Sequence, residues 1–192
     1  METRIFLTGP QGCGKSGLIR RALGDALAEA GGFVTRAEPG PEGFAIGYAL
    51  CPAASAADVE GLPCRRFLDC RAWPPAHDNE VFRSFGTQLL REAAYYPFAV
   101  LDEIGGFELL IPPFREALEE LLQSGLPLVG ALKTPEEAAQ WRELYGLGAR
   151  FTAQAERLHE LLENDPDTRI VDLRETGEAE AIALLRAWKE RV

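Results

Sequence analysis

Eight consecutive residues near the start of the chain have the types and the spacing that bind phosphate. Gly9–Ser16 reads Gly-Pro-Gln-Gly-Cys-Gly-Lys-Ser and fits the pattern Gly-x-x-x-x-Gly-Lys-[Ser/Thr] of the phosphate-binding loop, or Walker A motif. Glycines let the backbone curl so that N–H groups point at phosphate oxygens, while Lys15 reaches the outer phosphates and the Ser16 hydroxyl ligates Mg²⁺. The residues expected to bind ATP or another nucleoside triphosphate are Gly9, Pro10, Gln11, Gly12, Cys13, Gly14, Lys15, Ser16 and Gly17.

The residues on both sides of this loop predict the strand and the helix that must hold it. Ile5-Phe6-Leu7 is a short apolar run of the kind that forms a buried strand. After the loop, apolar residues recur at helical spacing and predict a helix from about residue 14 to residue 30, which Gly31-Gly32 would end. The N-terminus of that helix would add the positive end of its dipole to the phosphate site.

A second part of the site is predicted where an apolar run at residues 97–103 ends in two acidic residues. Such a run predicts a buried strand, and open α/β sheets bind ligands at the carboxyl ends of their strands. We expect Asp102, in a Walker B position, to hold Mg²⁺ directly or through water, and Glu103 to orient or deprotonate the attacking water. Neighbouring strand side chains point to opposite faces, so both would face a ligand only at a frayed strand end. The alternative for each residue is that it has no role in a site: Asp102 would be simply a residue at a strand end, and Glu103 its exposed neighbour.

The remaining hydrophobic patterns predict an α/β fold. Further strands are expected at residues 32–36 and 44–50, joined as a hairpin, and at 64–68, 126–132 and 169–173. Further helices are expected at residues 79–95, 111–125, 135–145, 151–163 and 178–191. Together they predict three layers in a single domain of residues 1–192, with a mainly parallel sheet, an antiparallel flank and helices on both faces. Residues 51–77, which prolines interrupt repeatedly, carry the weakest pattern.

The net charge of the chain indicates which kinds of molecule it is expected to bind. The formal net charge is −10, and nonspecific binding to nucleic acid needs a basic surface. Nucleic acid is therefore not an expected partner, whereas a nucleotide held by a local loop is. The apolar runs are strand-sized, so we expect no membrane-spanning segment. The first strand is predicted almost at Met1, which leaves no room for a signal peptide and favours the cytoplasm. The sequence leaves protein partners open.

Three cysteines outside the phosphate loop form no Cys-x-x-Cys pair. We expect Cys51, Cys64 and Cys70 to be free thiols of a reducing compartment. The alternative is a zinc site that these cysteines would form with His77, although the spacings match no common zinc motif.

The remaining cysteine lies inside the phosphate loop. Cys13 is close to Lys15 and at a helix N-terminus, which makes it a candidate reactive thiol. Our hypothesis is that its alkylation blocks nucleotide binding. The alternative is that Cys13 is simply a small residue tolerated at a variable position.

The chain resembles the small nucleoside-triphosphatase family of the THEP type. The segments GPQGCGKS, GGFVTR, FAIGYAL and LDEIGGFELL, with Phe114 after the last, carry the resemblance, which covers residues 3–50 and 98–132. It implies a RecA-like P-loop fold and Mg²⁺-dependent hydrolysis of several nucleoside triphosphates to diphosphates and phosphate. The resemblance also assigns Lys15 and Ser16 to the phosphates and Mg²⁺, Asp102 to Mg²⁺, and Glu103 to activation of water.

Two segments depart from the pattern of this family. Arg65-Arg66-Phe67 is a loose counterpart of a Gly-Arg-Tyr-like segment, and Leu132-Lys133-Thr134 stands where a small Thr-containing step is usual. Some cationic or hydrogen-bonding group must stabilise charge on the γ-phosphate in the transition state. Lys133 and Arg66 are the candidates.

Two other functions compete with hydrolysis. One is a small-molecule or nucleotide kinase, in which residues 51–77 would form an acceptor site or a lid. The other is a nucleotide-dependent switch or accessory protein whose slow hydrolysis times a partner interaction. Glu103 favours water as the acceptor, although a kinase base would look similar, and no segment is suited to reading a base edge, which favours broad base preference.

Overall fold

The computed structural model describes residues 2–192, and one mixed sheet of eight strands runs through them in the order β5-β4-β3-β2-β6-β7-β1-β8. The strands are β1 Arg4–Thr8, β2 Ala30–Pro39, β3 Ala45–Pro52, β4 Arg65–Asp69, β5 Ala76–His77, β6 Phe98–Ile104, β7 Leu128–Leu132 and β8 Thr168–Asp172. The strands from β2 to β8 in this order are parallel, and β3, β4 and β5 extend the sheet as an antiparallel flank. This confirms the mainly parallel sheet with an antiparallel flank.

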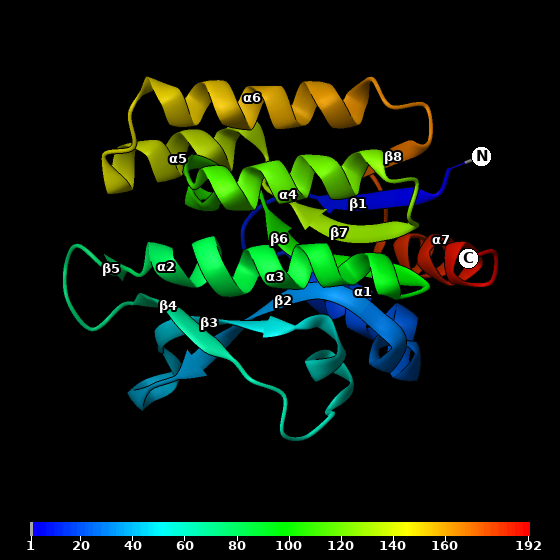
Figure 1. Ribbon diagram of the computed structural model, residues 1–192, viewed down its shortest axis with the longest axis horizontal. Helices are drawn as coiled ribbons and strands as arrows, with labels where there is room; N and C mark the ends of the chain where they lie inside the picture. The colour runs from blue at the N-terminus through cyan, green and yellow to red at the C-terminus, as the bar shows by residue number, and fades with distance from the viewer. Residues whose placement is uncertain (1) are drawn as a thin grey trace.

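Helices cover both faces of the sheet, as predicted (Figure 1). They are α1 Lys15–Leu23, α2 Asn79–Val81, α3 Thr87–Glu92, α4 Pro112–Gln123, α5 Pro135–Tyr145, α6 Ala149–Glu163 and α7 Glu178–Lys189. Side chains of β1 alternate between the two faces, because successive strand residues point opposite ways. Ile5 and Leu7 pack in one core with α1 and α7, whereas Phe6 packs in the other core with α3, α4 and α6.

Two predicted helices are not continuous. The first ends at Leu23, because Gly24 has a positive φ of 51°, and a 3-10 turn, Gly24–Glu29, completes the segment before β2. The helix predicted at 79–95 contains a wider turn at Phe82–Gly86, where the Thr87 hydroxyl donates to the Phe82 carbonyl at 3.0 Å. A Cβ on Gly86 would lie 3.0 Å from the Phe114 ring, so glycine there allows the close approach to α4.

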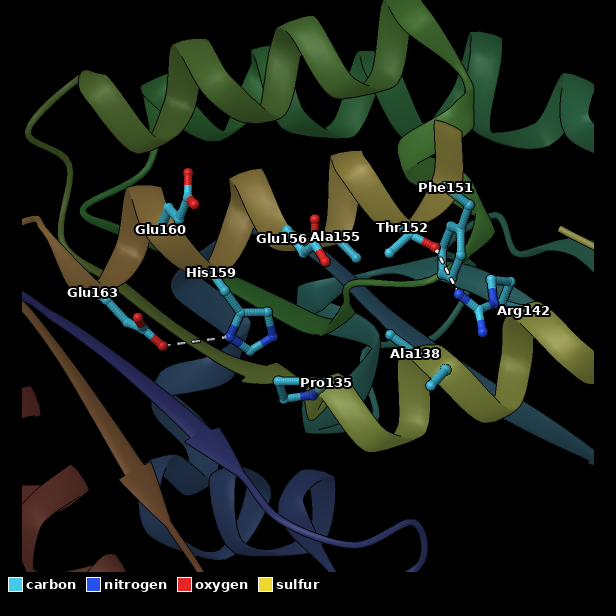
Figure 2. A pocket seen from close by; sticks show the side chains of 11 residues that line it. Pro135, Ala138, Arg142, Phe151, Thr152, Ala155, Glu156, His159, Glu160 and Glu163 are labelled. Atoms are coloured by element: carbon cyan, nitrogen blue, oxygen red, sulfur yellow. Dashed lines mark hydrogen bonds and ion pairs between the residues drawn. The ribbon is translucent and has the colours of Figure 1, made fainter. Parts of the chain in front are cut away.

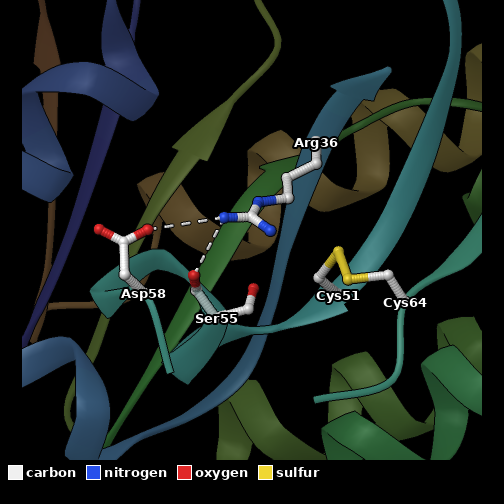
Figure 3. The surroundings of a disulfide bond; sticks show 5 residues. All are labelled: Arg36, Cys51, Ser55, Asp58 and Cys64. Atoms are coloured by element: carbon white, nitrogen blue, oxygen red, sulfur yellow. Dashed lines mark hydrogen bonds and ion pairs between the residues drawn. A yellow bond between two sulfur atoms is a disulfide. The ribbon is translucent and has the colours of Figure 1, made fainter. Parts of the chain in front are cut away.

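The expectation that Cys51 and Cys64 are free thiols is wrong, because the structure joins them in a disulfide (Figure 3). Antiparallel pairing of β3 and β4 places Leu50 opposite Arg65, so residues 51 and 64 form the next facing pair, with Cα atoms 4.4 Å apart. The bond also removes two of the four residues of the alternative zinc site. Within residues 2–192 no cluster of His, Cys, Asp or Glu is suited to a metal on its own.

Cys13 and Cys70 are the free cysteines of the described chain. The same residues contain no helix with the length and hydropathy needed to cross a membrane.

Removing the Cys51–Cys64 bond is expected to lower the free energy of unfolding. The bond joins residues 13 apart in sequence, and closing a loop of about this length contributes about 3 kcal/mol. At about 2–4 °C per kcal/mol for a chain of this size, a Cys51→Ser/Cys64→Ser protein should melt roughly 6–12 °C lower by calorimetry. Cys70→Ser, which removes a free thiol, is the control. An unchanged melting temperature in the double variant would contradict the pairing.

Candidate active site

The phosphate loop adopts a conformation that glycine makes accessible. Gly9, Gly12 and Gly14 have φ values of 143°, 78° and 93°, in the region that residues with a Cβ rarely adopt. The chain thus curls between β1 and α1 and turns the Lys15 side chain back over the loop. Its Nζ donates to the Gly9 carbonyl at 2.8 Å, although Lys15 is only 6% exposed.

The acidic end of β6 meets this loop. The Ser16 hydroxyl donates to Asp102 Oδ1 at 2.8 Å, and Lys15 Nζ lies 3.0 Å from Glu103 Oε1. Segments 86 residues apart in sequence are therefore in direct contact. The geometry satisfies the expectation that both carboxylates face the loop.

We expected a frayed strand end as the reason for this shared orientation, and that expectation is wrong. Asp102 is not at a frayed strand end, because β6 continues to Ile104. The pairing with β7 instead shifts register between Asp102 and Ile104. This irregularity inside the strand breaks the usual alternation of side chains.

Lys133 completes the group of charges. It directly follows β7, which lies between β1 and β6, so it emerges at the same edge of the sheet. Its Nζ forms an ion pair with Glu103 Oε2 and lies 4.6 Å from the centre of the Trp141 ring. Glu103 is consequently held between Lys15 and Lys133.

Arg66, the other candidate for the γ-phosphate, lies elsewhere. It is on β4, which β3 and β2 separate from β6, and its Nε is 2.5 Å from Glu38 Oε2. The neighbouring basic residues are also engaged on the flank, since Arg71 pairs with Asp69 and Arg65 lies over the Phe85 ring at 5.9 Å. The structure thus brings Lys133, and not Arg66, to the phosphate loop.

Glu137 is a site residue that the sequence analysis missed. Its Oε2 accepts from the Thr134 N–H at 2.9 Å while the Thr134 hydroxyl accepts from the Glu137 N–H at 3.0 Å, a capping box at the start of α5. Its Oε1 lies 3.5 Å from Lys15 Nζ. The spacing Thr134-x-x-Glu137 was the available signal, but it predicts a helix start and not a contact with residue 15.

Glu108 is a second missed carboxylate. It is 4% exposed, and its Oε1 accepts from the N–H groups of Gly105 and Gly106 at 2.8 and 2.7 Å. Burial raises the pKa of Glu108, although these N–H groups oppose the shift. Nothing in the local pattern of GGFELL distinguishes a buried carboxylate from an exposed one.

Burial and charge act in opposite directions on the central groups. Burial alone would lower the pKa of Lys15, but attraction to Glu103 and then Glu137 outweighs it and raises the pKa. For Glu103, burial would raise the pKa, yet Lys133 and Lys15 together lower it. Burial dominates at Asp102 and raises its pKa to about 6, against the opposing effect of the Ser16 hydrogen bond.

The donor set at the loop fits a hard divalent cation. Mg²⁺ prefers oxygen ligands and is held in nucleotide sites by one or two protein groups together with phosphates and water. The Ser16 hydroxyl and the buried Asp102 carboxylate supply such oxygens at the phosphate loop, and their mutual hydrogen bond shows that they share one location.

A small cavity of about 50 Å³ is lined by Ser16 and Asp102. Two larger cavities lie near these elements. One, of about 360 Å³, is bordered by Gln11, Glu103 and Lys133 and is otherwise mostly apolar. The other, of about 340 Å³, lies between α5 and α6, where Arg142 and His159 point toward it (Figure 2). In the described chain no phosphate-loop residue lines this second cavity, so the first one belongs to the site.

In this site a glycine loop between a strand and a helix places Lys15 and Ser16 against the carboxylates of a buried strand. This arrangement defines the class of P-loop NTPases. Comparison of the whole fold agrees. The crystal structure of THEP1 from the hyperthermophile Aquifex aeolicus superimposes with a TM-score of 0.62 at 17% identity, over 95% of this chain and 98% of that one. The P-loop NTPase fold is thereby confirmed.

Sequence comparison identifies the family. A family model described as NTPase matches residues 4–163. The cancer-related nucleoside-triphosphatase homolog of Mus musculus is 30% identical over 150 residues, which cover 71% of this chain and 78% of the relative. Nucleoside-triphosphatase THEP1 of Thermotoga sp. strain RQ2 is 31% identical over 133 residues, covering 68% and 74%. This chain therefore belongs to the NTPase family, which confirms the resemblance to THEP-type proteins.

Replacing Asp102 is expected to stabilise the free protein at neutral and higher pH. The pKa of Asp102 is raised from 3.8 to about 6, so its ionisation lowers the free energy of unfolding. This loss is fully present above pH 6 and absent below pH 3.8, the pKa in the unfolded state. Asp102→Asn, which keeps an acceptor for Ser16, should raise the free energy of unfolding by on the order of 2–3 kcal/mol at pH 8. The gain should shrink as the pH falls through 6.

Urea unfolding of both proteins at pH 5 and pH 8, without Mg²⁺ or nucleotide, measures this difference. Asp58→Asn is the control, because the Asp58 side chain is 94% exposed. A gain that is equal at the two pH values would show that burial of the Asp102 charge is not its cause.

Proposed function

We propose that residues 1–192 form one P-loop domain that hydrolyses nucleoside triphosphates, ATP among them, to diphosphates and phosphate with Mg²⁺ and little preference for the base. The observation that carries this proposal is the contact between the phosphate loop and the acidic strand, Ser16 with Asp102 and Lys15 with Glu103. Membership of the NTPase family, whose relatives are named nucleoside-triphosphatases, supports the same reaction.

The loop would bind the triphosphate through backbone N–H groups of residues 9–17, except Pro10, which has none, and through Lys15. Ser16 and Asp102 would hold Mg²⁺, which would supply positive charge to offset the charge of the phosphates. Lys133 is our candidate for the γ-phosphate, since it lies at the same strand edge as Glu103. Two lysines and a metal would then surround the group that is transferred.

Glu103 would act on the attacking water. In the free protein its carboxylate is paired with Lys15 and Lys133, and these ion pairs lower its pKa. Phosphate oxygens would compete for both lysines, so nucleotide binding would release Glu103 and move its pKa back toward the ordinary value. The base would thus become available when the substrate is in place.

Glu103→Gln should retain affinity for Mg·ATP and lose turnover by a factor of about 10²–10⁴, the usual contribution of a general base. Lys15→Ala should instead lose binding, because Lys15 is expected to contact the phosphates directly. Steady-state phosphate release and calorimetric titration with Mg·ATP separate the two effects. Glu136→Gln, a neighbouring exposed carboxylate, is the matched control. Undiminished turnover in the Glu103 variant would remove that residue from catalysis.

Phosphate release measured with ATP, GTP, CTP and UTP tests the substrate range. Because a phosphate loop contacts no base, kcat/KM is expected to vary by less than about tenfold among them, a difference of about 1.4 kcal/mol. Release without any added acceptor also separates hydrolysis from a strict kinase. Turnover well below about 1 s⁻¹, with a stable partner complex, would favour a nucleotide-dependent switch.

A further inference from the structure

The cavity beside the phosphate loop is much larger than hydrolysis requires. Its volume is about 360 Å³, whereas a water molecule occupies about 30 Å³ of liquid. Small-molecule sites measure about 300–1,000 Å³ and combine apolar walls with a few polar groups. The cavity has this composition, since Glu103, Lys133 and Gln11 lie beside walls that are otherwise mostly apolar.

The walls are predominantly aromatic. Tyr48, Phe67, Phe82, Phe107, Trp141 and Tyr145 contribute rings from β3, β4, α5 and neighbouring turns. The rings already pack on one another, with centroids 4.9 Å apart for Trp141 and Tyr145 and 5.0 Å for Phe67 and Phe82. A flat ring inserted among them would gain further stacked or edge-to-face contacts.

Part of this wall comes from the segment 51–77, whose sequence pattern was the weakest. Phe67 on β4 lines the cavity, and so do Cys70, Trp73 and Pro75, which follow β4 in the chain. Trp73 is 74% exposed. A large indole is therefore held at the cavity while most of its surface faces solvent.

The position of the cavity relative to the charges indicates what it would hold. Under the proposed function, Glu103 and Lys133 face the γ-phosphate, and attack on that phosphate comes from the side opposite the leaving diphosphate. The cavity is bordered by these same two residues. Its occupant would therefore be an acceptor of the phosphoryl group and not the base of the nucleotide, which is attached beyond the leaving diphosphate.

We propose that this cavity binds a small aromatic molecule carrying a hydroxyl group, to which the protein transfers the γ-phosphoryl group of the nucleotide. The hydroxyl oxygen forms a bond to the γ-phosphorus, the hydroxyl proton passes to the Glu103 carboxylate, and the bond to the β–γ bridging oxygen breaks with its electrons on the departing diphosphate. Water takes the same place when the cavity is empty. Transfer rests on the proposed function, whereas binding in the cavity does not.

The probes are 2-naphthalenemethanol and its methyl ether, which has the same ring and no transferable proton. Equilibrium dialysis without nucleotide measures their binding. Trp73→Ala should weaken the binding of both about fivefold, the usual effect of losing one aromatic contact. Phe44→Ala is the matched control, because Phe44 is 73% exposed and is absent from the described cavity wall. It should leave binding unchanged.

With γ-labelled ATP and Mg²⁺, the alcohol should yield a labelled naphthylmethyl phosphate and one ADP for each ester formed. The methyl ether should yield no ester and should slow phosphate release, because it displaces the attacking water. Failure of both probes to bind saturably, or binding that Trp73→Ala leaves unchanged, would overturn the proposed site.

Two further outcomes separate this inference from the proposed function. Binding without ester formation, in a protein that hydrolyses ATP, would overturn the acceptor role and leave hydrolysis intact. Binding that depends on Trp73, in a protein that neither hydrolyses nor transfers, would support the cavity as a site and refute the proposed function.

Discussion

A single buried ammonium group joins the three segments of the site. Lys15 Nζ contacts the Gly9 carbonyl in its own loop, Glu103 just before the last residue of β6, and Glu137 at the start of α5. A charge taken out of water is costly unless several partners compensate it. The free protein supplies these partners from distant parts of the chain, and a triphosphate would supply phosphate oxygens in their place. The Lys15 ammonium group thus holds the segments of the site together in the free protein and would be available to bind the triphosphate.

The order of the strands explains why these partners are within reach. Because β7 lies between the loop strand β1 and the acidic strand β6, the segment that follows β7 emerges between the loop and the carboxylates. That segment carries Lys133 at its start and Glu137 in the first turn of α5. Parallel strands place their carboxyl ends at one edge, so three strands deliver charged groups to a single location.

The antiparallel flank has a different role. It adds β3, β4 and β5 beyond β2 and contributes Tyr48 and Phe67 to the aromatic wall of the cavity beside Glu103. The Cys51–Cys64 bond joins the end of β3 to the residue before β4 and packs in the core with α1 and α7, whereas Phe67 of β4 packs in the other core. The bond therefore ties the flank together on the face away from the cavity, while the charged part of the site depends on the parallel strands.

The sequence alone determined the features that short patterns encode. The residues of the phosphate loop, the acidic end of β6, the hairpin and most element positions follow from spacing over a few residues, because backbone geometry and side-chain periodicity are local properties. Only the tertiary structure decided which distant groups meet. Glu137 at Lys15, Lys133 in place of Arg66, the pairing of Cys51 with Cys64 and the cavity wall from residues 51–77 depend on strand order and register. Both are set by packing across the whole sheet, and no local window of the sequence contains them.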